Sequence, residues 1–178
     1  MNKTKGLVLA ALFAALTAIG AFLKIPVGGM AITLQFFFTA MAGVLLGAKW
    51  GAISQAVYVL LGLVGLPIFT KGGGVGYLFE PSFGFLLGLI PAAAVIGLLC
   101  GDGKKPVRVF LACTAGLGVL YLVGMPYMYL ILNVYMGLGK AMKSLLWSYM
   151  IIYLPGDFAK IIVTVLLARP LRKAVRRA

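Results

Sequence analysis

The chain contains no histidine, three acidic residues and two cysteines among its 178 residues. The cysteines, Cys100 and Cys113, form no CxxC motif, so without histidine we expect no zinc site and no other metal site. No G-x-x-x-x-G-K-S/T sequence occurs, so the chain has no P-loop with which to bind ATP. No carboxylate pair accompanies a plausible nucleophile. We therefore expect neither an enzyme nor a bound cofactor.

Charged residues are also scarce, at 11% of the chain, whereas hydrophobic residues make up 63%. A water-soluble domain is about half apolar and about a quarter charged. One hydrophobic core cannot absorb so much apolar surface, so lipid must solvate a large part of it. We predict an all-α integral membrane protein in which residues 1–178 form a single transmembrane domain.

The charge that is present is strongly positive, with a net charge of +13. The basic residues form no stripe with interleaved aromatics, so nucleic acid is not expected as a partner. They cluster at the ends of apolar runs, which is typical of a membrane protein anchored against anionic cytoplasmic lipid. We expect a multi-pass protein of the cell membrane, in particular a bacterial plasma membrane.

Apolar runs long enough to cross a bilayer predict a bundle of six transmembrane helices. The first five are 7–23, 32–48, the run from the turn at 49–51 to Leu66, 81–100 and 107–133. The C-terminal region allows two interpretations. Either 145–168 is one kinked helix, or 140–153 lies at the membrane interface and the sixth span starts at Pro155. We favour the second because four side chains suit an interface: Lys140, Lys143, Trp147 and Tyr149.

Six spans place both termini on one side of the membrane. The positive-inside rule makes that side the cytoplasm, because the opposite orientation would leave most lysines and arginines outside. The loops 24–31, 67–80 and 134–144 then face outward, where an extracellular ligand would meet them.

Two charged residues fall inside a predicted span, Asp157 and Lys160 of the sequence P-G-D-F-A-K. At a spacing of i, i+3 they share one face of a helix. A local ion pair near a favourable helix dipole would explain how they are tolerated. Because intramembrane charges are costly, we give more weight to function. A carboxylate beside an ammonium group would suit a cyclic urea or amide, since one accepts N–H and the other donates to C=O.

The second candidate site is the glycine-rich outer loop 67–82. Its glycines, among them Gly73 and Gly74, let the main chain approach a ligand closely. The loop also supplies aromatic and charged side chains: Phe69, Lys71, Tyr77 and Glu80. The same composition is equally consistent with a flexible hairpin between two spans.

The first predicted helix is rich in alanine, with Ala10, Ala14 and Ala18 recurring every four residues, as do Ala11 and Ala15. Small residues at this spacing let helices approach closely in lipid. Packing within the same bundle is the simpler interpretation, and docking of a partner is the alternative.

Several segments together resemble the BioY family, the biotin-binding S components of energy-coupling factor (ECF) transporters. They are I-T-L-Q at 32–35, the run 43–63, G-L-P-I-F-T-K-G-G-G-V-G-Y at 65–77, P-S-F-G-F-L-L-G at 81–88 and L-P-G-D-F-A-K at 154–160. The resemblance covers nearly the whole chain, and it implies six helices that bind biotin from the outer side.

The resemblance also implies roles for individual residues. The predicted ligand-binding set is Asp157, Lys160, Glu80, Phe69, Lys71, Gly73, Gly74, Tyr77 and Gln35. Family members often carry a neutral residue at the place of Glu80. The small-residue face of the first helix, here Ala10, Ala14 and Ala18, is implied to dock a transmembrane coupling subunit, which works with two ATPase subunits.

Biotin fits this set, because it has a cyclic urea at one end and a carboxylate tail at the other. Asp157, Glu80 and Lys160 match the two donors and one acceptor of the urea, and Lys71 or loop amides match the tail. The alternative is an S component for another vitamin, such as riboflavin or pantothenate. A structural membrane protein with no ligand would leave Asp157 and Lys160 with no task beyond pairing.

Overall fold

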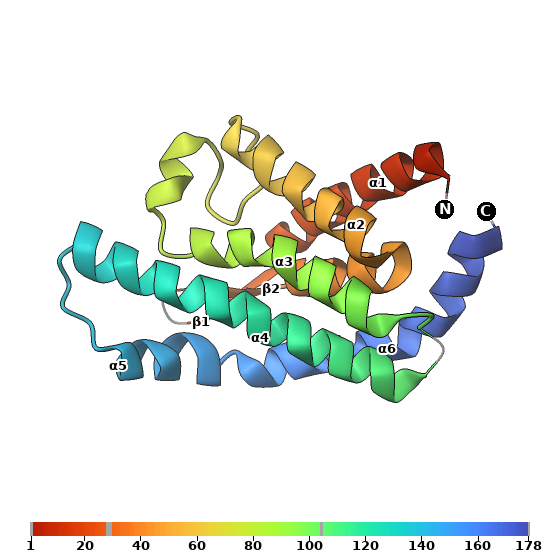
Figure 1. The fold of residues 1–178 in the computed structure, drawn as a ribbon. Helices are drawn as coiled ribbons and strands as arrows, with labels where there is room; N and C mark the ends of the chain where they lie inside the picture. The colour runs from red at the N-terminus through yellow and green to blue at the C-terminus, as the bar shows by residue number, and fades with distance from the viewer. Residues whose placement is uncertain (1, 28–29, 104, 178) are drawn as a thin grey trace.

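The computed structural model describes residues 2–27, 30–103 and 105–177, and most of the chain is helical (Figure 1). The α-helices are α1 (Lys3–Phe22), α2 (Gln35–Leu63), α3 (Phe83–Cys100), α4 (Pro106–Leu130), α5 (Met142–Leu146) and α6 (Leu154–Arg177). A 3-10 turn, η1 (Val75–Phe79), precedes α3, and two π-helical turns, η2 (Ile131–Tyr135) and η3 (Trp147–Ile151), follow α4 and α5.

The longest helix, α2, is a hairpin of two helical segments that reverses at Gly47. Gly47 has φ +80°, a conformation that glycine adopts without the steric cost that a side chain would bring. Residues at equal distances from Gly47 meet: Thr39 donates to Gln55 Oε1 at 2.9 Å, and a Cβ added to Gly51 would lie 3.0 Å from Gly43.

The predicted pair of helices therefore exists, but three of the predicted bounds were wrong. The turn lies at Gly47 rather than at 49–51, the first segment begins at Gln35 rather than at 32, and the second ends at Leu63 rather than at Leu66. After Leu63 the chain instead turns at residues 64–65, where Gly65 has φ +117°.

The segment between α1 and α2 forms an element that the sequence analysis did not predict. Strand β1 (Lys24–Val27) pairs antiparallel with β2 (Met30–Thr33), with Lys24 opposite Thr33. Pro26 cannot continue a helix, which explains why α1 ends at Phe22. The hairpin occupies residues that had been assigned to an irregular break and to the start of the second span.

The C-terminal region has the break that we favoured, since α5 and η3 end at Ile151 and α6 begins at Leu154. The two parts are bent by only 40° and together run alongside α4 (Figure 1). The structure thus has a break between two helical parts, as in the favoured interpretation, and the placement of 140–153 at the membrane interface stays a prediction.

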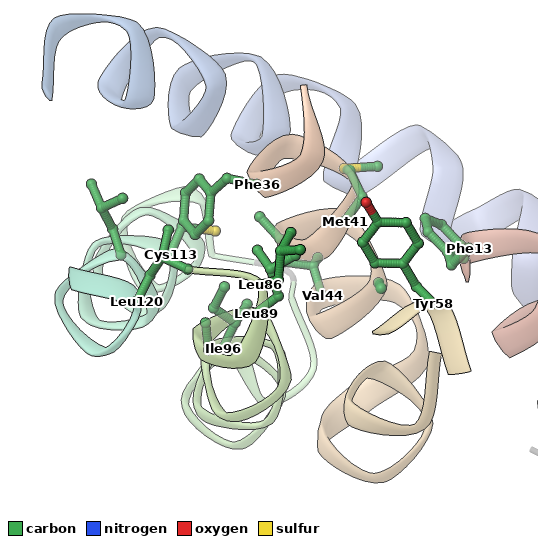
Figure 2. Close-up of a cluster of buried hydrophobic side chains, with 14 of the residues drawn as sticks. Phe13, Phe36, Met41, Val44, Tyr58, Leu86, Leu89, Ile96, Cys113 and Leu120 are labelled. Atoms are coloured by element: carbon green, nitrogen blue, oxygen red, sulfur yellow. The ribbon is translucent and has the colours of Figure 1, made fainter. Parts of the chain in front are cut away.

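The core lies between α1, the two segments of α2, α3 and α4. Figure 2 shows Phe36, Leu86, Leu89, Ile96 and Leu120 gathered around it. Both cysteines, Cys100 and Cys113, are buried and free. In the part of the chain that the structure describes, four helices are long and apolar enough to span a membrane, or five if the bent α5–α6 pair is one span and α2 is counted once.

The ends of these elements fall into two groups along the long axis of the molecule (Figure 1). Both termini, the turn at Gly47 and the turn that follows α3 lie toward one end. The loop 64–82 and the connection 131–141 lie at the other end. The cavity described next opens among the elements of this second end.

Candidate ligand-binding site

A cavity of about 450 Å³ lies between the β-hairpin, the loop before α3, and helices α3, α4 and α6. Its apolar wall comes mainly from Phe36, Phe85, Leu86, Leu89, Leu120, Met128 and Leu132. Its polar wall consists of Lys24, Thr33, Gln35, Thr70, Lys71, Tyr77, Glu80, Ser82, Tyr121, Tyr149, Tyr153, Asp157 and Lys160. Few convergent polar groups on an apolar wall are typical of a small-molecule site.

One buried polar group of the cavity is the Asp157 cluster, made of Asp157, Lys160 and Tyr121. Asp157 lies in the first turn of α6, where its backbone N–H donates to Tyr153 O at 3.1 Å, and it is 7% exposed. Lys160 Nζ donates to Oδ1 at 2.7 Å, and Tyr121 Oη donates to Oδ2 at 2.7 Å. One turn of α4 and one turn of α6 thus meet at this carboxylate inside the bundle.

This cluster keeps capacity for a ligand. Each carboxylate oxygen can accept two hydrogen bonds, and Lys160 carries two N–H donors besides the one that it gives to Asp157. The cluster can therefore accept N–H groups and donate to a carbonyl at the same time, as the spacing of the two charges predicted.

A second charged group lies at the mouth of the cavity. Lys71 Nζ donates to Glu80 Oε2 at 2.8 Å, with the two side chains 56% and 32% exposed. Lys24 Nζ donates to Thr70 O at 2.7 Å and so joins the β-hairpin to the loop. We call Lys24, Lys71 and Glu80 the mouth cluster.

Two further predicted residues, Gln35 and Tyr77, line the cavity and are nearly buried. Gln35 Nε2 donates to Tyr58 Oη at 2.8 Å and its Oε1 accepts from Thr33 at 2.9 Å, so its amide is fixed by both neighbours. The Tyr77 hydroxyl is hydrogen-bonded to that of Thr70 at 2.8 Å. Hydrogen bonds therefore fix the orientation of both side chains in the wall of the cavity.

Three predicted residues do not line the cavity: Phe69, Gly73 and Gly74. Phe69 is 1% exposed and packs edge-on against Tyr58, with Tyr77 and Phe83 beside it. Gly74 has φ +96° and donates its N–H to Gly62 O at 2.7 Å. The structure thus gives these residues a role in shaping the loop.

The sequence analysis missed several lining residues. Tyr121 is the most consequential, because it holds Asp157 from a helix 36 positions away, and a polar hydroxyl inside an apolar span was the available signal. Ser82 was also missed; its Oγ is buried and has no hydrogen-bond partner within the described part of the chain. Tyr149 had been assigned to an interface but lines the cavity.

Helix α1 packs part of its small-residue face into the bundle, in line with the simpler interpretation of the sequence. Ala10 and Ala14 are 2% and 4% exposed and face the bundle, and Ala18 is half-buried against the core. Ala11 and Ala15, on the other face, are exposed. Internal packing therefore accounts for Ala10 and Ala14, and the exposed face carries Ala11 and Ala15.

Among residues 2–27, 30–103 and 105–177, no group of three or more histidine, cysteine, aspartate or glutamate side chains comes together. The carboxylates of the cavity, Glu80 and Asp157, are each paired with a lysine. Its chemistry is that of hydrogen bonding and charge pairing with a small polar molecule.

Comparison with known proteins gives consistent results over nearly the full length. The model of the BioY family matches residues 1–177. The chain is 42% identical to a probable biotin transporter BioY of Lysinibacillus sphaericus, over 99% of this chain and 91% of that protein. It is 37% identical to a biotin transporter BioY of Thermotoga maritima, over 94% and 95% of the two chains.

A solved structure has the same fold. The crystal structure of the S-component for biotin from an ECF-type ABC transporter superimposes with a TM-score of 0.85. The two sequences are 29% identical, and the match covers 97% of this chain and 95% of the other.

Proposed function

The chain belongs to the BioY family, and from this premise we propose that it captures biotin for uptake as the substrate-specific subunit of an ECF-type transporter. The observation that carries the proposal is the pairing of the Asp157 cluster with a separate cationic mouth across one cavity of about 450 Å³. Biotin has a matching division, with a cyclic urea at one end and a carboxylate at the other.

We place the urea at the Asp157 cluster. The carboxylate of Asp157 accepts an N–H of the urea, and Lys160 donates to its carbonyl oxygen. Burial favours this assignment, because a neutral, hydrogen-bonding head group enters an apolar enclosure at a lower desolvation cost than a carboxylate. The apolar rings then contact the wall formed by Phe36, Leu86 and Leu120.

We place the carboxylate tail at the mouth cluster, beside Lys71 and Lys24. Glu80 was assigned to the urea on sequence grounds, but it lies in an ion pair with Lys71 near solvent. In this proposal the ligand carboxylate shares Lys71 with Glu80. The carboxylate of Glu80 repels the carboxylate of biotin, so Glu80 lowers the affinity for biotin.

The membrane arrangement that we propose has six spans, with both termini in the cytoplasm of a bacterial cell. The reversal at Gly47 supports counting α2 as two segments, and the bent α5–α6 pair supports counting those helices as one. The position of both termini at the end opposite the cavity supports an outward-facing mouth (Figure 1). The positive-inside rule favours the same orientation.

We further propose that uptake requires a transmembrane coupling subunit and two ATPase subunits, because the chain has no P-loop. We propose that the coupling subunit docks on the exposed face of α1, which carries Ala11 and Ala15, instead of on Ala10, Ala14 and Ala18. Small residues on that face permit close approach of a helix.

Isothermal titration of detergent-purified protein tests the ligand assignment. Biotin should bind one-to-one, while riboflavin and pantothenate, as matched vitamins with different polar groups, should give no heat of binding. Binding of either control vitamin in preference to biotin would refute the assignment of the cavity. A melting temperature that biotin leaves unchanged would refute the assignment as well, because a ligand of the native state stabilises it.

A further inference from the structure

A second cavity, of about 480 Å³, opens between α4 and the chain that runs from α5 into α6. We call it the α4–α5 groove. Its wall is almost entirely apolar, and the side chains that define it are Leu117, Met125, Met142, Leu146, Met150 and Phe158. Leu117, Tyr121 and Met125 of its wall also belong to the core. Tyr121 is shared with the Asp157 cluster, and the other side chains of the groove wall take no part in the proposed capture of biotin.

The length of the groove matches one leaflet of a membrane. Along α4 it extends from Thr114 to Pro126, which corresponds to roughly 18 Å at 1.5 Å per residue. Half of a hydrocarbon core of about 30 Å is about 15 Å. An extended acyl chain entering from the outer leaflet would therefore run along most of the groove.

Two features keep the groove open. Gly118 lies on its wall, and a Cβ added there would meet no described atom within 4 Å. Tyr121 lies on the same wall, and its hydroxyl is tied to Asp157, so the ring cannot swing outward to fill the space without losing that bond. Protein interiors are close-packed, so an apolar channel of this size in a bilayer is filled by another molecule.

The end of the groove near α5 is basic. Met142 and Leu146 line it, and the exposed Lys143 lies between them in the same helix, with the exposed Lys140 just before. The three acidic residues of the chain, Glu80, Asp102 and Asp157, all lie outside 131–153. Trp147, 66% exposed, follows in the same stretch, and tryptophan and lysine are both enriched where membrane proteins meet lipid headgroups.

From the apolar wall, its length and its charged end, we propose that the α4–α5 groove binds one anionic phospholipid. One acyl chain lies along α4, and the phosphate of the headgroup lies beside Lys143. The lysine selects anionic over zwitterionic lipid, because each basic residue near the surface strengthens attachment to anionic headgroups. This site is independent of the identity of the vitamin.

Photolabelling of the full-length chain in phosphatidylcholine vesicles tests the proposal. The probe is phosphatidylglycerol with a photoreactive group at the middle of one acyl chain, and labelled residues are mapped by mass spectrometry. Label should concentrate on 114–126 and 142–158. An even distribution over all lipid-facing helices would overturn the proposal, as would labelled or cross-linked dimers showing that a second copy covers the groove.

Two substitutions distinguish lipid bound in the groove from lipid on the rest of the surface. Gly118→Leu fills the open space and suits a helix, so labelling of these segments should fall several-fold. Leu111→Phe, which adds volume on the exposed surface of α4 outside the groove, should leave labelling unchanged. Equal labelling in both variants would contradict an acyl chain in the groove.

The headgroup assignment has its own variant, Lys143→Gln, at an exposed position of α5. Lys143→Gln should reduce labelling by the phosphatidylglycerol probe about fivefold, while Lys173→Gln at the far end of α6 should have no effect. A phosphatidylcholine probe with the same photoreactive chain should be insensitive to Lys143→Gln. Equal labelling by both probes in the wild type would overturn selection of anionic lipid.

Discussion

The Asp157 cluster and the mouth cluster contain nearly the same ion pair in two different surroundings. The lysine–carboxylate distances are 2.7 Å for Lys160–Asp157 and 2.8 Å for Lys71–Glu80. Both side chains of the inner pair are 10% exposed, whereas those of the outer pair are 56% and 32% exposed. The lysine–carboxylate distance therefore does not distinguish the two ion pairs, whereas their burial does.

The energetic difference follows from the solvent. An exposed ion pair contributes about 0–1 kcal/mol, because water screens both charges. Removing one partner of a buried pair costs about 3–5 kcal/mol, because the other charge is left without compensation. We therefore expect substitutions at the inner cluster to dominate ligand affinity and substitutions at the mouth to adjust it.

The largest expected effect is that of Asp157→Asn. The amide keeps the shape of the side chain but loses the charged acceptor, so biotin affinity should fall by about 2–5 kcal/mol, roughly 30-fold or more. Titration calorimetry measures the change. Affinity within threefold of the wild type would remove Asp157 from the site.

A double substitution controls for a loss of stability in this variant. Asp157→Asn leaves Lys160 charged and unpaired, whereas Asp157→Asn combined with Lys160→Met removes both charges and should restore the melting temperature without restoring binding. Recovery of binding in the double variant would show that the single change acted through stability alone.

The next effect concerns Tyr121, whose hydroxyl donates to Asp157 Oδ2. Tyr121→Phe removes one hydrogen bond to a charged group, so affinity should fall about tenfold, corresponding to about 1.5 kcal/mol. Tyr129→Phe is the matched control, since Tyr129 is on the same helix but does not line the cavity. Equal losses in the two variants would deny Tyr121 a specific role.

A smaller effect is expected at the mouth. Glu80→Gln frees Lys71 from its ion pair, so biotin should bind more tightly, by less than about fivefold, and Lys71→Gln should weaken binding by a similarly small factor. Added salt should reduce both differences, because exposed charges are screened. A loss of binding in Glu80→Gln as large as in Asp157→Asn would break the comparison between the clusters.

The smallest expected effect on affinity is that of Ala11→Leu, outside both clusters. Ala11 is exposed on α1, so biotin binding should be unchanged while uptake by cells containing the coupling subunit falls. Ala14→Leu is the contrast, because Ala14 is 4% exposed and overpacking there costs about 1–3 kcal/mol of stability. Full uptake with Ala11→Leu would exclude this face as the docking surface.

The sequence could predict contacts between site residues that are close together in the chain, but not contacts between residues that are far apart in it. Asp157 and Lys160 share a helix turn, so their pairing followed from their spacing alone. Tyr121 reaches Asp157 from another helix, and no local pattern links residues 36 positions apart. Lys24 and Ser82 were missed for the same reason, since the fold alone brings them to the cavity.

The errors in the fold also have physical causes. Both faces of α1 are apolar, one against the bundle and one against lipid, so hydrophobicity could not tell Ala10 and Ala14 from Ala11 and Ala15. The reversal at Gly47 depends on one positive φ, and the chain has 24 glycines that could supply it. The BioY segments identified the family correctly because they combine several such local features.

Competition between biotin and two altered ligands tests the orientation of the bound vitamin most directly. Biotin methylated on a urea nitrogen loses a donor to Asp157, and biotin amide loses the charge that faces the mouth. We predict that methylation of the urea weakens binding by at least about 30-fold, and that amidation weakens it by less than about fivefold. A larger loss for the amide than for the methylated urea would contradict the central role of the buried Asp157 cluster.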